Sequence, residues 1–444
     1  MRASELAGVV GGELFGRDTT VEGAVIDSRR VRGGELFVPI VAERDGHDYI
    51  GAAIDAGAAA YLTSGPIEAA TAVHVGNTSE ALLALGRHAR SKVVDRVVGV
   101  TGSVGKTSTK DLLARVLATT YRTAASERSF NNELGVPLTL FNALDGTEAS
   151  VIEMGARNRG HITLLCDVAK PTVGVVTVVA GAHLEQFGSL DEVAAAKGEL
   201  VACLPSDGCA VLNADDPRVA AMAERTGARV LTFGRASGDV RAEQITVDGE
   251  LRPSFRLRSP WGAGEVRLAA RGAHQVINGV AAAAAAFAVD VPLDAVLDGL
   301  AAAEMSAMRM ELSTGRRGVR VLNDAYNANP VSMAAALDAL ASLPAQRRIA
   351  VLGTMAELGP TGAAEHAAIA RRAAERDIRL VTIDEPAYGV EGPDAVASIE
   401  DAVEHLGALA EGDAVLVKAS RIVGLERLAA RLLAGEDDRP NSTR

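Results

Sequence analysis

The sequence predicts an α/β protein with three domains, and three observations support this prediction. First, 444 residues are enough for about three domains of roughly 150 residues each. Second, short apolar runs alternate with amphipathic segments along most of the chain, which is typical of parallel sheets covered by helices. Third, a Gly-rich segment at 99–108 stands between such a run and a helix. We expect the domains at 1–92, 93–308 and 309–444.

The composition excludes several classes of protein. The 45 Lys and Arg residues against 57 Asp and Glu residues give a net charge of −12, which disfavours nonspecific binding to nucleic acid. The N-terminus lacks an apolar signal core, and no run reaches the roughly 18 apolar residues of a membrane span. Cys166, Cys203 and Cys209 show no CxxC spacing, which argues against a disulfide framework or a zinc site. We therefore expect a cytoplasmic protein that does not insert into membranes.

Residues 1–92 are expected to form a small α/β domain. Residues 34–39 follow a turn and favour a strand, and residues 50–57 favour a helix that ends at a glycine. A second strand is expected at 60–62. The last helix, at 80–94, has apolar residues at Leu82, Leu83, Leu85 and Ala89.

Residues 93–308 are expected to form a parallel sheet with an antiparallel insertion. A strand at 97–100 precedes a helix at 107–118. In 229–271, short alternating runs flank Asp248-Gly249, which is a hairpin signal. The other expected strands are 150–153, 173–179 and 210–212, and a helix follows at 276–289.

Residues 309–444 favour a doubly wound, Rossmann-like domain. Asn329-Pro330 places a good N-cap before a proline at the first helical position, so a helix is expected to begin there. The expected strands are 319–322, 349–352, 378–383 and 414–417.

The segment from Gly99 to Ser108 has the composition and the position of a phosphate-binding loop. Its glycines let backbone N–H groups approach phosphate oxygens, and the helix N-terminus adds a favourable dipole. Lys106 can reach the β- and γ-phosphates, and the Thr107 hydroxyl can ligate Mg²⁺. The strict pattern GxxxxGK[ST] fails, because Val100 holds the place of its first glycine. The expected nucleotide-binding residues of the loop are Gly102, Ser103, Val104, Gly105, Lys106, Thr107 and Ser108.

Two further polar residues follow neighbouring strands, where α/β sheets place their ligands. Glu153 ends the strand at 150–153, and His183 comes after the strand at 173–179. Either side chain could ligate Mg²⁺ near Thr107, and either could be a solvated loop residue. Position alone leaves both interpretations open.

With these residues the sequence resembles the Mur ligases of peptidoglycan synthesis, and most of all the branch that adds D-alanyl-D-alanine. The block DAYNANP at 324–330 is the most diagnostic of that branch. Departures from the family pattern fall at 42–47 and 128–130, in the expected nucleotide-sugar site. The matching blocks are DSRRVRGGELFVPI at 27–40, VTGSVGKTS at 100–108, SFNNELGVPLTL at 129–140, VIEMGARNRGHI at 151–162, AHLEQFGSLDEVAAAKGEL at 182–200, LNADDPRV at 212–219, AHQVINGVAAAAA at 273–285, NDAYNANPVSM at 323–333 and LGTMAELG at 352–359.

The resemblance implies ATP-dependent amide formation. The γ-phosphoryl group of ATP would activate a carboxylate of UDP-N-acetylmuramoyl-tripeptide as an acyl phosphate, which the amine of D-alanyl-D-alanine would then attack. The resemblance also implies an N-terminal domain that binds the uridine nucleotide, two Mg²⁺ ions and a monomer. Thr107 and Glu153 would hold the first Mg²⁺, and His183 would help to hold the second.

The same resemblance gives a role to Lys197, which lies on a helix that a capping-box pattern opens at 189–192. From position alone, a solvated helix lysine is the favoured interpretation. In related Mur ligases, however, the matching lysine carries a carbamate, whose oxygens suit a metal site. We therefore expect Lys106, Lys197 and His183 to act in catalysis, and Thr107, Glu153, His183 and Lys197 to lie at the metals.

Other site residues are implied by the matching blocks. Asn278 resembles the residue beside adenine or ribose, with His274 as its neighbour. Arg309 resembles the arginine that reaches the phosphates when the C-terminal domain closes. Asp324 ends a strand and is therefore placed to face the nucleotide.

Some candidates keep a structural alternative. Asn327 and Asn329 could contact the substrate or only build a turn, and Asn329 is sufficiently explained as an N-cap. Lys418 and Arg421 could bind the peptide or the dipeptide, or belong to a surface cluster. The candidates for nucleotide-sugar or peptide contacts are Ser28, Arg29, Asn131 and Asn132.

Two other functions compete with this one. A folate polyglutamate ligase uses the same chemistry, but the separate N-terminal domain and the DAYNANP block argue against it. A regulatory P-loop protein would bind ATP without ligating anything, and the polar strand ends of the third domain argue against that. A requirement for both UDP-muramoyl peptide and D-alanyl-D-alanine in ATP turnover would discriminate among them.

Overall fold

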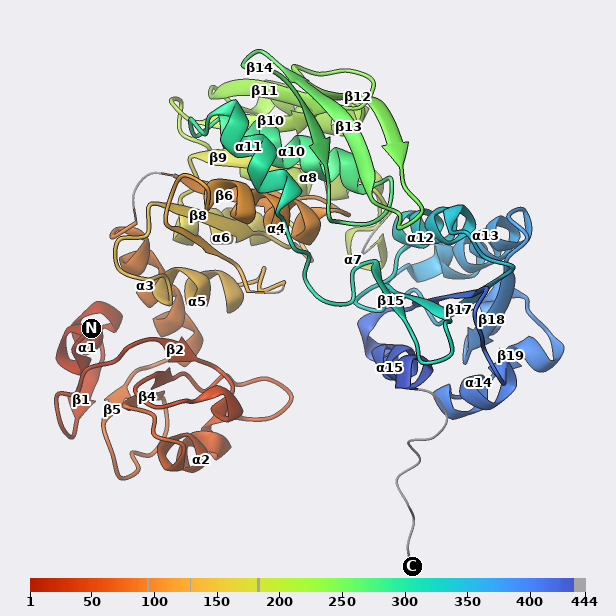
Figure 1. The fold of residues 1–444 in the computed structure, drawn as a ribbon. Helices are drawn as coiled ribbons and strands as arrows, with labels where there is room; N and C mark the ends of the chain where they lie inside the picture. The colour runs from red at the N-terminus through yellow and green to blue at the C-terminus, as the bar shows by residue number, and fades with distance from the viewer. Residues whose placement is uncertain (94–95, 128, 182–183, 435–444) are drawn as a thin grey trace, which may run out of the picture.

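The computed structural model describes residues 1–93, 96–127, 129–181 and 184–434, and the strands of these residues form three sheets. Each sheet has helices packed on it, so the architecture is the α/β class that the sequence predicts. The central domain lies between the N-terminal domain, drawn in red to orange, and the C-terminal domain, drawn in cyan to blue (Figure 1).

In the N-terminal domain, a sheet of order β1-β5-β4-β3-β2 packs against α1 and α3. β1 and β5 are antiparallel, and the other neighbours are parallel. Leu82 and Leu85 of α3 are fully buried in the core of this domain, whereas Leu83 and Ala89 pack against the core of the central domain. The elements are α1 Ala3–Val10, β1 Glu13–Phe15, β2 Ala24–Val25, η1 Ser28–Arg30, β3 Leu36–Phe37, η2 Gly46–Tyr49, α2 Ile50–Asp55, β4 Ala60–Thr63, β5 Ala72–His74 and α3 Thr78–Arg90.

Helix α5 (Gly135–Phe141) of the central domain fixes the N-terminal domain in place. It packs against α3, and its Leu138 belongs to the core of the N-terminal domain. Beyond its end, the Asn142 side chain accepts a hydrogen bond from the Ala24 amide at 2.7 Å and donates one to the Ala24 carbonyl at 2.9 Å. The two domains therefore share both apolar and polar contacts.

The central sheet has the order β14-β13-β12-β11-β10-β9-β6-β8-β7 and is covered by helices on both faces. In β6, Val98 and Val100 face α4 and α10, whereas Val97 faces α6 and α8, as the alternation of side chains along a strand requires. The elements are β6 Val97–Thr101, α4 Lys106–Leu117, β7 Thr123–Ala125, α5, β8 Ala149–Glu153, α6 His161–Ala169, β9 Val173–Val176, α7 Leu184–Phe187, α8 Leu190–Ala202, β10 Cys209–Asn213, α9 Pro217–Ala220, η3 Ala221–Arg225, β11 Arg229–Gly234, β12 Val240–Val247, β13 Pro253–Ser259, β14 Gly262–Arg267, α10 Gln275–Phe287 and α11 Leu293–Ala301.

The antiparallel insertion begins later than the sequence predicts. β11 pairs parallel with β10 and with β12, and the antiparallel pairs of this region are β12 with β13 and β13 with β14. Alternation of apolar residues reports which face is buried but not the direction of the partner strand, so the prediction that 229 opens the insertion was wrong. β9 also ends at Val176 rather than Val179, and Thr177 to Ala180 run beside the phosphate loop instead.

The C-terminal sheet has the order β15-β16-β20-β17-β18-β19, with β15 antiparallel and the other neighbours parallel. Both faces are packed, as in the doubly wound domain that the sequence predicts. The elements are β15 Glu311–Thr314, β16 Arg320–Asn323, α12 Pro330–Ser342, β17 Arg347–Leu352, η4 Gly359–Thr361, α13 Gly362–Ala374, β18 Arg379–Ile383, η5 Pro386–Tyr388, η6 Gly392–Asp394, β19 Ala395–Val396, α14 Ile399–Leu406, β20 Asp413–Lys418, η7 Arg421–Val423 and α15 Glu426–Ala434.

The turn between β12 and β13 joins the central domain to the C-terminal domain. Its Leu251 is almost fully buried in the C-terminal core, together with Met310 and Leu322. Beside it, Arg320 donates hydrogen bonds to the Gly249 carbonyl at 3.2 Å and to Glu250 at 2.7 Å. This turn therefore docks the C-terminal domain at a second place besides the chain connection.

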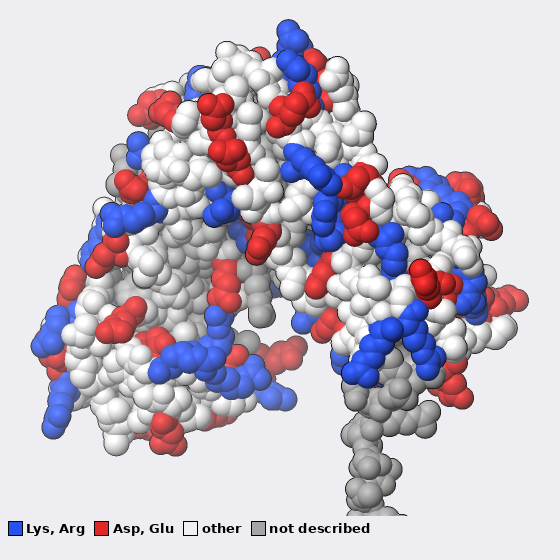
Figure 2. Space-filling model, in the orientation of Figure 1, with Lys and Arg blue, Asp and Glu red and all other residues white. Residues whose placement is uncertain are grey.

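The surface carries both signs of charge. Lys and Arg are interspersed with Asp and Glu on the face in Figure 2, which is hollowed between the N-terminal and C-terminal domains, below the central domain. Among the described helices, none has the length and apolar character that crossing a membrane requires.

Candidate active site

A cavity of about 770 Å³ lies where the phosphate loop meets the C-terminal domain. This volume lies within the range of sites for small ligands. The described residues that line the cavity come from the central and C-terminal domains. They include Ser103, Val104, Gly105, Lys106, Thr107, Ser108, Asn131, Asn132, Glu153, Lys197, Asn278, Arg309 and Asp324.

The phosphate loop bends sharply between β6 and α4. Gly102 and Gly105 have φ angles of +144° and +85°, which side-chain-bearing residues rarely adopt. A Cβ atom at Gly105 would lie 2.5 Å from Oδ1 of Asn278, and one at Gly102 would overlap the Thr177 hydroxyl. Glycine at these two positions therefore lets the loop pack closely against α10 and the end of β9.

The segment after β9 holds the loop in shape. Ser103 donates its backbone N–H to the Val178 carbonyl at 2.8 Å, and its hydroxyl donates to the Ala180 carbonyl at 2.8 Å. The Thr177 hydroxyl donates to the Val104 carbonyl at 2.6 Å. A loop fixed by such contacts is preorganised for an anion, because little ordering is left for the ligand to impose.

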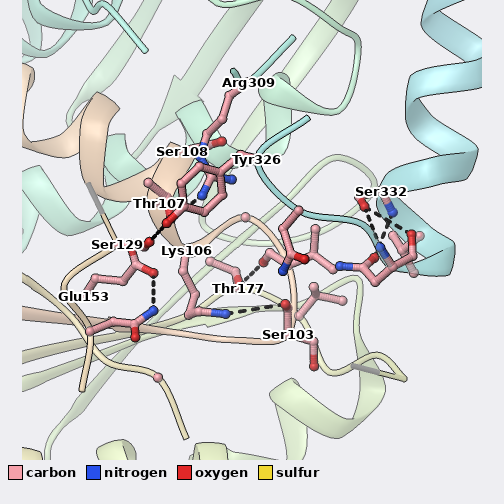
Figure 3. A pocket seen from close by; sticks show the side chains of 18 of the residues that line it. Ser103, Lys106, Thr107, Ser108, Ser129, Glu153, Thr177, Arg309, Tyr326 and Ser332 are labelled. Atoms are coloured by element: carbon pink, nitrogen blue, oxygen red, sulfur yellow. Dashed lines mark hydrogen bonds between the residues drawn. The ribbon is translucent and has the colours of Figure 1, made fainter. Parts of the chain in front are cut away.

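Lys106 stands at the N-terminus of α4 and lies over the loop. Its Nζ donates to the carbonyl of Gly102 at 2.7 Å and points along the loop in Figure 3. Burial lowers the pKa of Lys106, while the nearby charge of Glu153 opposes that shift. An ammonium group over a loop that leads into a helix N-terminus is an arrangement that favours phosphate oxygens.

Glu153 is the carboxylate that best fits a metal ion. It ends β8 and is 1% exposed, and its Oε1 accepts a hydrogen bond from the Asn131 amide at 2.8 Å. Its other oxygen, Oε2, is buried and has no hydrogen-bond partner among the described residues. A buried carboxylate oxygen without a donor is costly, and a cation would remove that cost.

The donor set suits Mg²⁺ rather than a metal held by protein alone. Within the described ranges, no cluster of three or more His, Cys, Asp or Glu side chains could hold a metal. Mg²⁺ typically uses one or two protein ligands together with phosphate oxygens and water, which Glu153 and the Thr107 hydroxyl would satisfy. The predicted ligand His183 lies outside the described residues.

Arg309 brings the C-terminal side of the cavity onto the phosphate loop. Its Nη2 donates to the Thr107 hydroxyl at 2.9 Å, and its guanidinium lies 4.4 Å from the ring centroid of Tyr326. Tyr326 in turn hydrogen-bonds Ser129 of the central domain. Figure 3 shows Arg309 and Tyr326 together above Thr107. Residues on both sides of the domain boundary therefore meet at the expected γ-phosphate end of the loop.

Lys197 faces the cavity and is not a solvated helix lysine, because only 2% of it is exposed. Burial, and then the charge of Lys106, lower the pKa of Lys197 to about 7. Ser189 caps the N-terminus of its helix, α8, by accepting a hydrogen bond from the Glu192 amide at 3.2 Å. Lys197 thus combines a low pKa with a place beside Lys106.

Asn278 and His274 lie near the start of α10, beside Gly105 of the loop. Asn278 donates to the Gln275 side chain at 2.9 Å and packs against Gly105. Burial lowers the pKa of His274. Both side chains line the cavity.

Asp324 and Lys418 form a buried ion pair at 2.5 Å in the cavity wall. Lys418 also donates to the Asn327 carbonyl at 2.8 Å, and Oδ1 of Asp324 accepts from the Met310 amide at 3.1 Å. Lys418 is therefore not part of a surface cluster. Asp324 fixes both Lys418 and the backbone next to Arg309.

Other predicted residues have structural partners or lie elsewhere. Asn329 forms a full capping box with Ser332 at the start of α12. Asn132 accepts hydrogen bonds from the amides at the start of α5. Ser28 and Arg29 belong to the N-terminal domain and are not among the described lining residues. The exposed Arg29 pairs with Asp27 at 2.8 Å.

Several lining residues were not selected from the sequence. Thr177 and Tyr326 follow the ends of β9 and β16, so position after a strand is the signal that could have found them. Val331 and Ile422 are apolar side chains that are 48% and 79% exposed, and both line the cavity. Their exposure cannot be read from the sequence.

Family models and full-length relatives match the chain. The model described as Mur ligase middle domain matches residues 100–286, and the model described as Mur ligase, glutamate ligase domain matches residues 308–421. A relative from Mycobacterium tuberculosis is 39% identical over 100% of this chain and 99% of its own length. That relative is named UDP-N-acetylmuramoyl-tripeptide–D-alanyl-D-alanine ligase.

Solved structures resemble the whole chain. A crystal structure of MurF from Acinetobacter baumannii has a TM-score of 0.86 at 28% identity, covering 97% of this chain and 98% of that one. The MurF ligase from Thermotoga maritima, in complex with ADP, has a TM-score of 0.80 at 28% identity, with 94% and 98% covered. L. casei FPGS, at 19% identity and a TM-score of 0.57, covers 78% of this chain and 93% of its own, and shares the fold alone.

Proposed function

The chain belongs to the Mur ligase family, and from this premise we propose how its cavity carries out the ligation. The enzyme joins D-alanyl-D-alanine to UDP-N-acetylmuramoyl-tripeptide at the expense of ATP, as its full-length relatives are named for doing. The observation that supports this function best is the cavity itself, in which the phosphate loop, Glu153, Lys197 and Arg309 converge. The folate ligase alternative matches only distant structures.

The chemistry requires an activated carboxylate. A carboxylate is a poor acyl donor because its leaving group would be oxide, whereas an acyl phosphate releases phosphate. Lys106 and Arg309 are placed to neutralise charge that develops on the transferred phosphoryl group. The protein then holds the dipeptide amine against the acyl carbon, where orientation supplies much of the rate enhancement.

Thr107 and Glu153 would hold a Mg²⁺ ion, and the unpartnered Oε2 of Glu153 supports this assignment. When bound, Mg²⁺ would neutralise phosphate charge and fix the orientation of the phosphates. In this structure Arg309 donates a hydrogen bond to the Thr107 hydroxyl, which is the oxygen proposed to ligate Mg²⁺. We therefore infer that Arg309 shifts from Thr107 to the nucleotide when ATP and Mg²⁺ bind. His183 keeps its proposed role at a second Mg²⁺.

We also propose that Lys197 is carbamylated in the active enzyme. Carbamate formation needs a neutral amine, and the lowered pKa of about 7 makes that form available near neutral pH. The carbamate carries a negative charge, which the adjacent Lys106 and a metal ion would stabilise. Burial of the side chain protects such a group from solvent.

The uridine-nucleotide substrate would span the hollow between the N-terminal and C-terminal domains (Figure 2). Ser28 and Arg29 are proposed to contact its uridine end, and Asn131 and Asn132 its peptide end beside the cavity. The residues of one chain complete the cavity, so we propose the monomer as the active unit. Because ATP is a co-substrate, we propose the cytoplasm as its compartment.

The dipeptide is proposed to bind on the C-terminal wall of the cavity. Val331 and Ile422 present exposed apolar surface there, which suits the two methyl groups of D-alanyl-D-alanine. Arg421 lies next to Ile422 and also lines the cavity, so its guanidinium is proposed to meet the dipeptide carboxylate in place of its present partner Glu426 at 3.0 Å.

This placement predicts a change in dipeptide selectivity. Ile422→Ala should raise the KM for D-alanyl-D-alanine and reduce the preference over glycylglycine, because one apolar contact is worth about 10–200-fold in discrimination. The KM for ATP should stay constant. Val247→Ala, another exposed apolar residue, serves as the control. An unchanged preference would place the dipeptide elsewhere.

The function as a whole is tested by product analysis. Mass spectrometry of reactions with a panel of UDP-muramoyl tripeptides and dipeptides should show a UDP-muramoyl pentapeptide. The absence of pentapeptide, together with glutamate added to a folate in a parallel reaction that supplies folate and glutamate, would support the alternative.

A further inference from the structure

Helices α6 and α8 pack against each other along one seam. Near the C-terminal end of α8, Glu199 accepts hydrogen bonds from backbone amides at the start of α6, from Gly160 at 2.6 Å and from Thr163 at 3.0 Å. One helical turn further along, Cys203 follows Glu199 by four residues and Cys166 follows Thr163 by three. Residues at these spacings lie on the same face of a helix, so the seam brings the two cysteines together.

The two thiols differ in exposure and in acidity. Cys203 is exposed at the C-cap of α8, whereas Cys166 is buried in α6. The Cys166 thiol lies within hydrogen-bonding reach of the Cys203 sulfur, and this contact lowers the pKa of Cys203 to about 7, against burial and the charge of Glu199, which both raise it. The Thr163 hydroxyl donates to Glu199 at 3.1 Å on the same seam. The same contact with Cys203, together with burial, raises the pKa of Cys166. An exposed thiolate beside a buried thiol is the arrangement of a redox-sensitive pair.

We propose that Cys166 and Cys203 are a site of reversible oxidation, which forms an intramolecular disulfide when the protein meets hydrogen peroxide. The Cys203 thiolate attacks one peroxide oxygen, so that an S–O bond forms, the O–O bond breaks and hydroxide leaves to become water. The Cys166 sulfur then attacks the Cys203 sulfur, forming the S–S bond and releasing a second water that carries the Cys166 proton. Two thiols are oxidised and one peroxide is reduced.

The disulfide would act on the active site through α8. Hydrogen-bonded sulfurs are farther apart than the roughly 2.05 Å of a disulfide, so the bond draws the end of α8 toward α6. Lys197 lies on α8, and His161 at the start of α6 also lines the cavity. Oxidation should therefore lower ligase turnover several-fold, a consequence that rests on the proposed function.

The test treats the full-length enzyme with hydrogen peroxide, then maps disulfides by mass spectrometry and measures turnover before and after a thiol reductant. We expect a Cys166–Cys203 cross-link, a several-fold loss of turnover and recovery on reduction. After the same peroxide treatment, Cys203→Ser should contain no cross-link and should keep its turnover. Cys209→Ala, which removes the buried thiol of β10, should behave as the unaltered enzyme does.

Three results would overturn the proposal. The first is sulfinic acid at Cys203 without a cross-link, and the second is a cross-link that leaves turnover unchanged. The third is a loss of turnover on peroxide treatment that is as large in Cys203→Ser as in the unaltered enzyme. Disulfide mapping does not depend on activity. An enzyme that forms the cross-link but makes no pentapeptide even when reduced would therefore refute the proposed function and not the thiol pair.

Discussion

Of the six lysines in the chain, Lys106, Lys197 and Lys418 line the cavity. Burial lowers the pKa of all three. Lys418 is paired with Asp324 and Lys197 is proposed to carry a carbamate, so Lys106 and Arg309 supply the positive charge at the phosphate loop. In a protein of net charge −12, a buried positive site of this kind is best explained by anionic substrates. ATP and a carboxylate meet that requirement.

Glu153→Gln tests the metal site at the scale of one residue. Glutamine keeps the shape and can still accept the hydrogen bond from Asn131, but it loses the negative charge. The Mg²⁺ concentration for half-maximal turnover should rise by about tenfold or more, because a hard cation prefers a charged oxygen ligand. Glu265→Gln on exposed β14 is the control. If the Mg²⁺ dependence stays the same, Glu153 does not ligate the metal.

Lys197→Ala tests the carbamate. It should reduce turnover by orders of magnitude, and short carboxylic acids should partly restore turnover by supplying the missing oxygens. Lys92→Ala is the control, because Lys92 is exposed and pairs only loosely with Glu5 at 3.7 Å. Lys170 is less suitable, since its φ of +41° would strain alanine. A variant with normal turnover, or one that no acid rescues, would contradict the proposed role.

The sequence predicted only part of the set of polar residues that line the cavity. The phosphate loop could be predicted because its residues are contiguous and its glycines have a local cause. The contacts of Arg309 with Thr107 and of Ser129 with Tyr326 join residues 202 and 197 positions apart. Only the folded chain shows such pairs, and only the fold shows that Lys197 is buried.

Short elements at the edges of sheets were not predicted from the sequence, whereas long helices were. α4 and α10 have full apolar faces, and both lie within a few residues of the expected bounds. β15 is partly exposed and β19 has two residues, so neither carries an apolar run to detect. β11 shows that alternation of side chains does not specify strand direction.

At the scale of an element, Asn329 tests the start of α12. Its side chain accepts from the Ser332 amide at 2.9 Å, so Asn329→Ala should lower the free energy of unfolding by about 1 kcal/mol. Asn329→Ser should restore most of that stability, because serine also caps helices. Urea unfolding of both variants measures the difference. A loss of turnover without any loss of stability would show that Asn329 contacts substrate instead.

At the scale of the whole molecule, the cavity depends on how the C-terminal domain sits. Met308 and Met310 flank Arg309 and have positive φ angles of 60° and 53°, which is unusual for such side chains. Two contacts hold the C-terminal domain against the central domain. Leu251 is inserted into the C-terminal core, and Tyr326 hydrogen-bonds Ser129. The strained backbone beside Arg309 thus places its guanidinium on the phosphate loop.

We infer that substrates complete this site, so that ATP is used only when both UDP-muramoyl tripeptide and D-alanyl-D-alanine are present. The most direct measurement is the rate of ADP formation with each substrate omitted in turn, together with the yield of pentapeptide. We predict equal amounts of ADP, phosphate and UDP-muramoyl pentapeptide, and slow ADP formation when either substrate is missing. Rapid ATP hydrolysis by the enzyme alone would contradict this account.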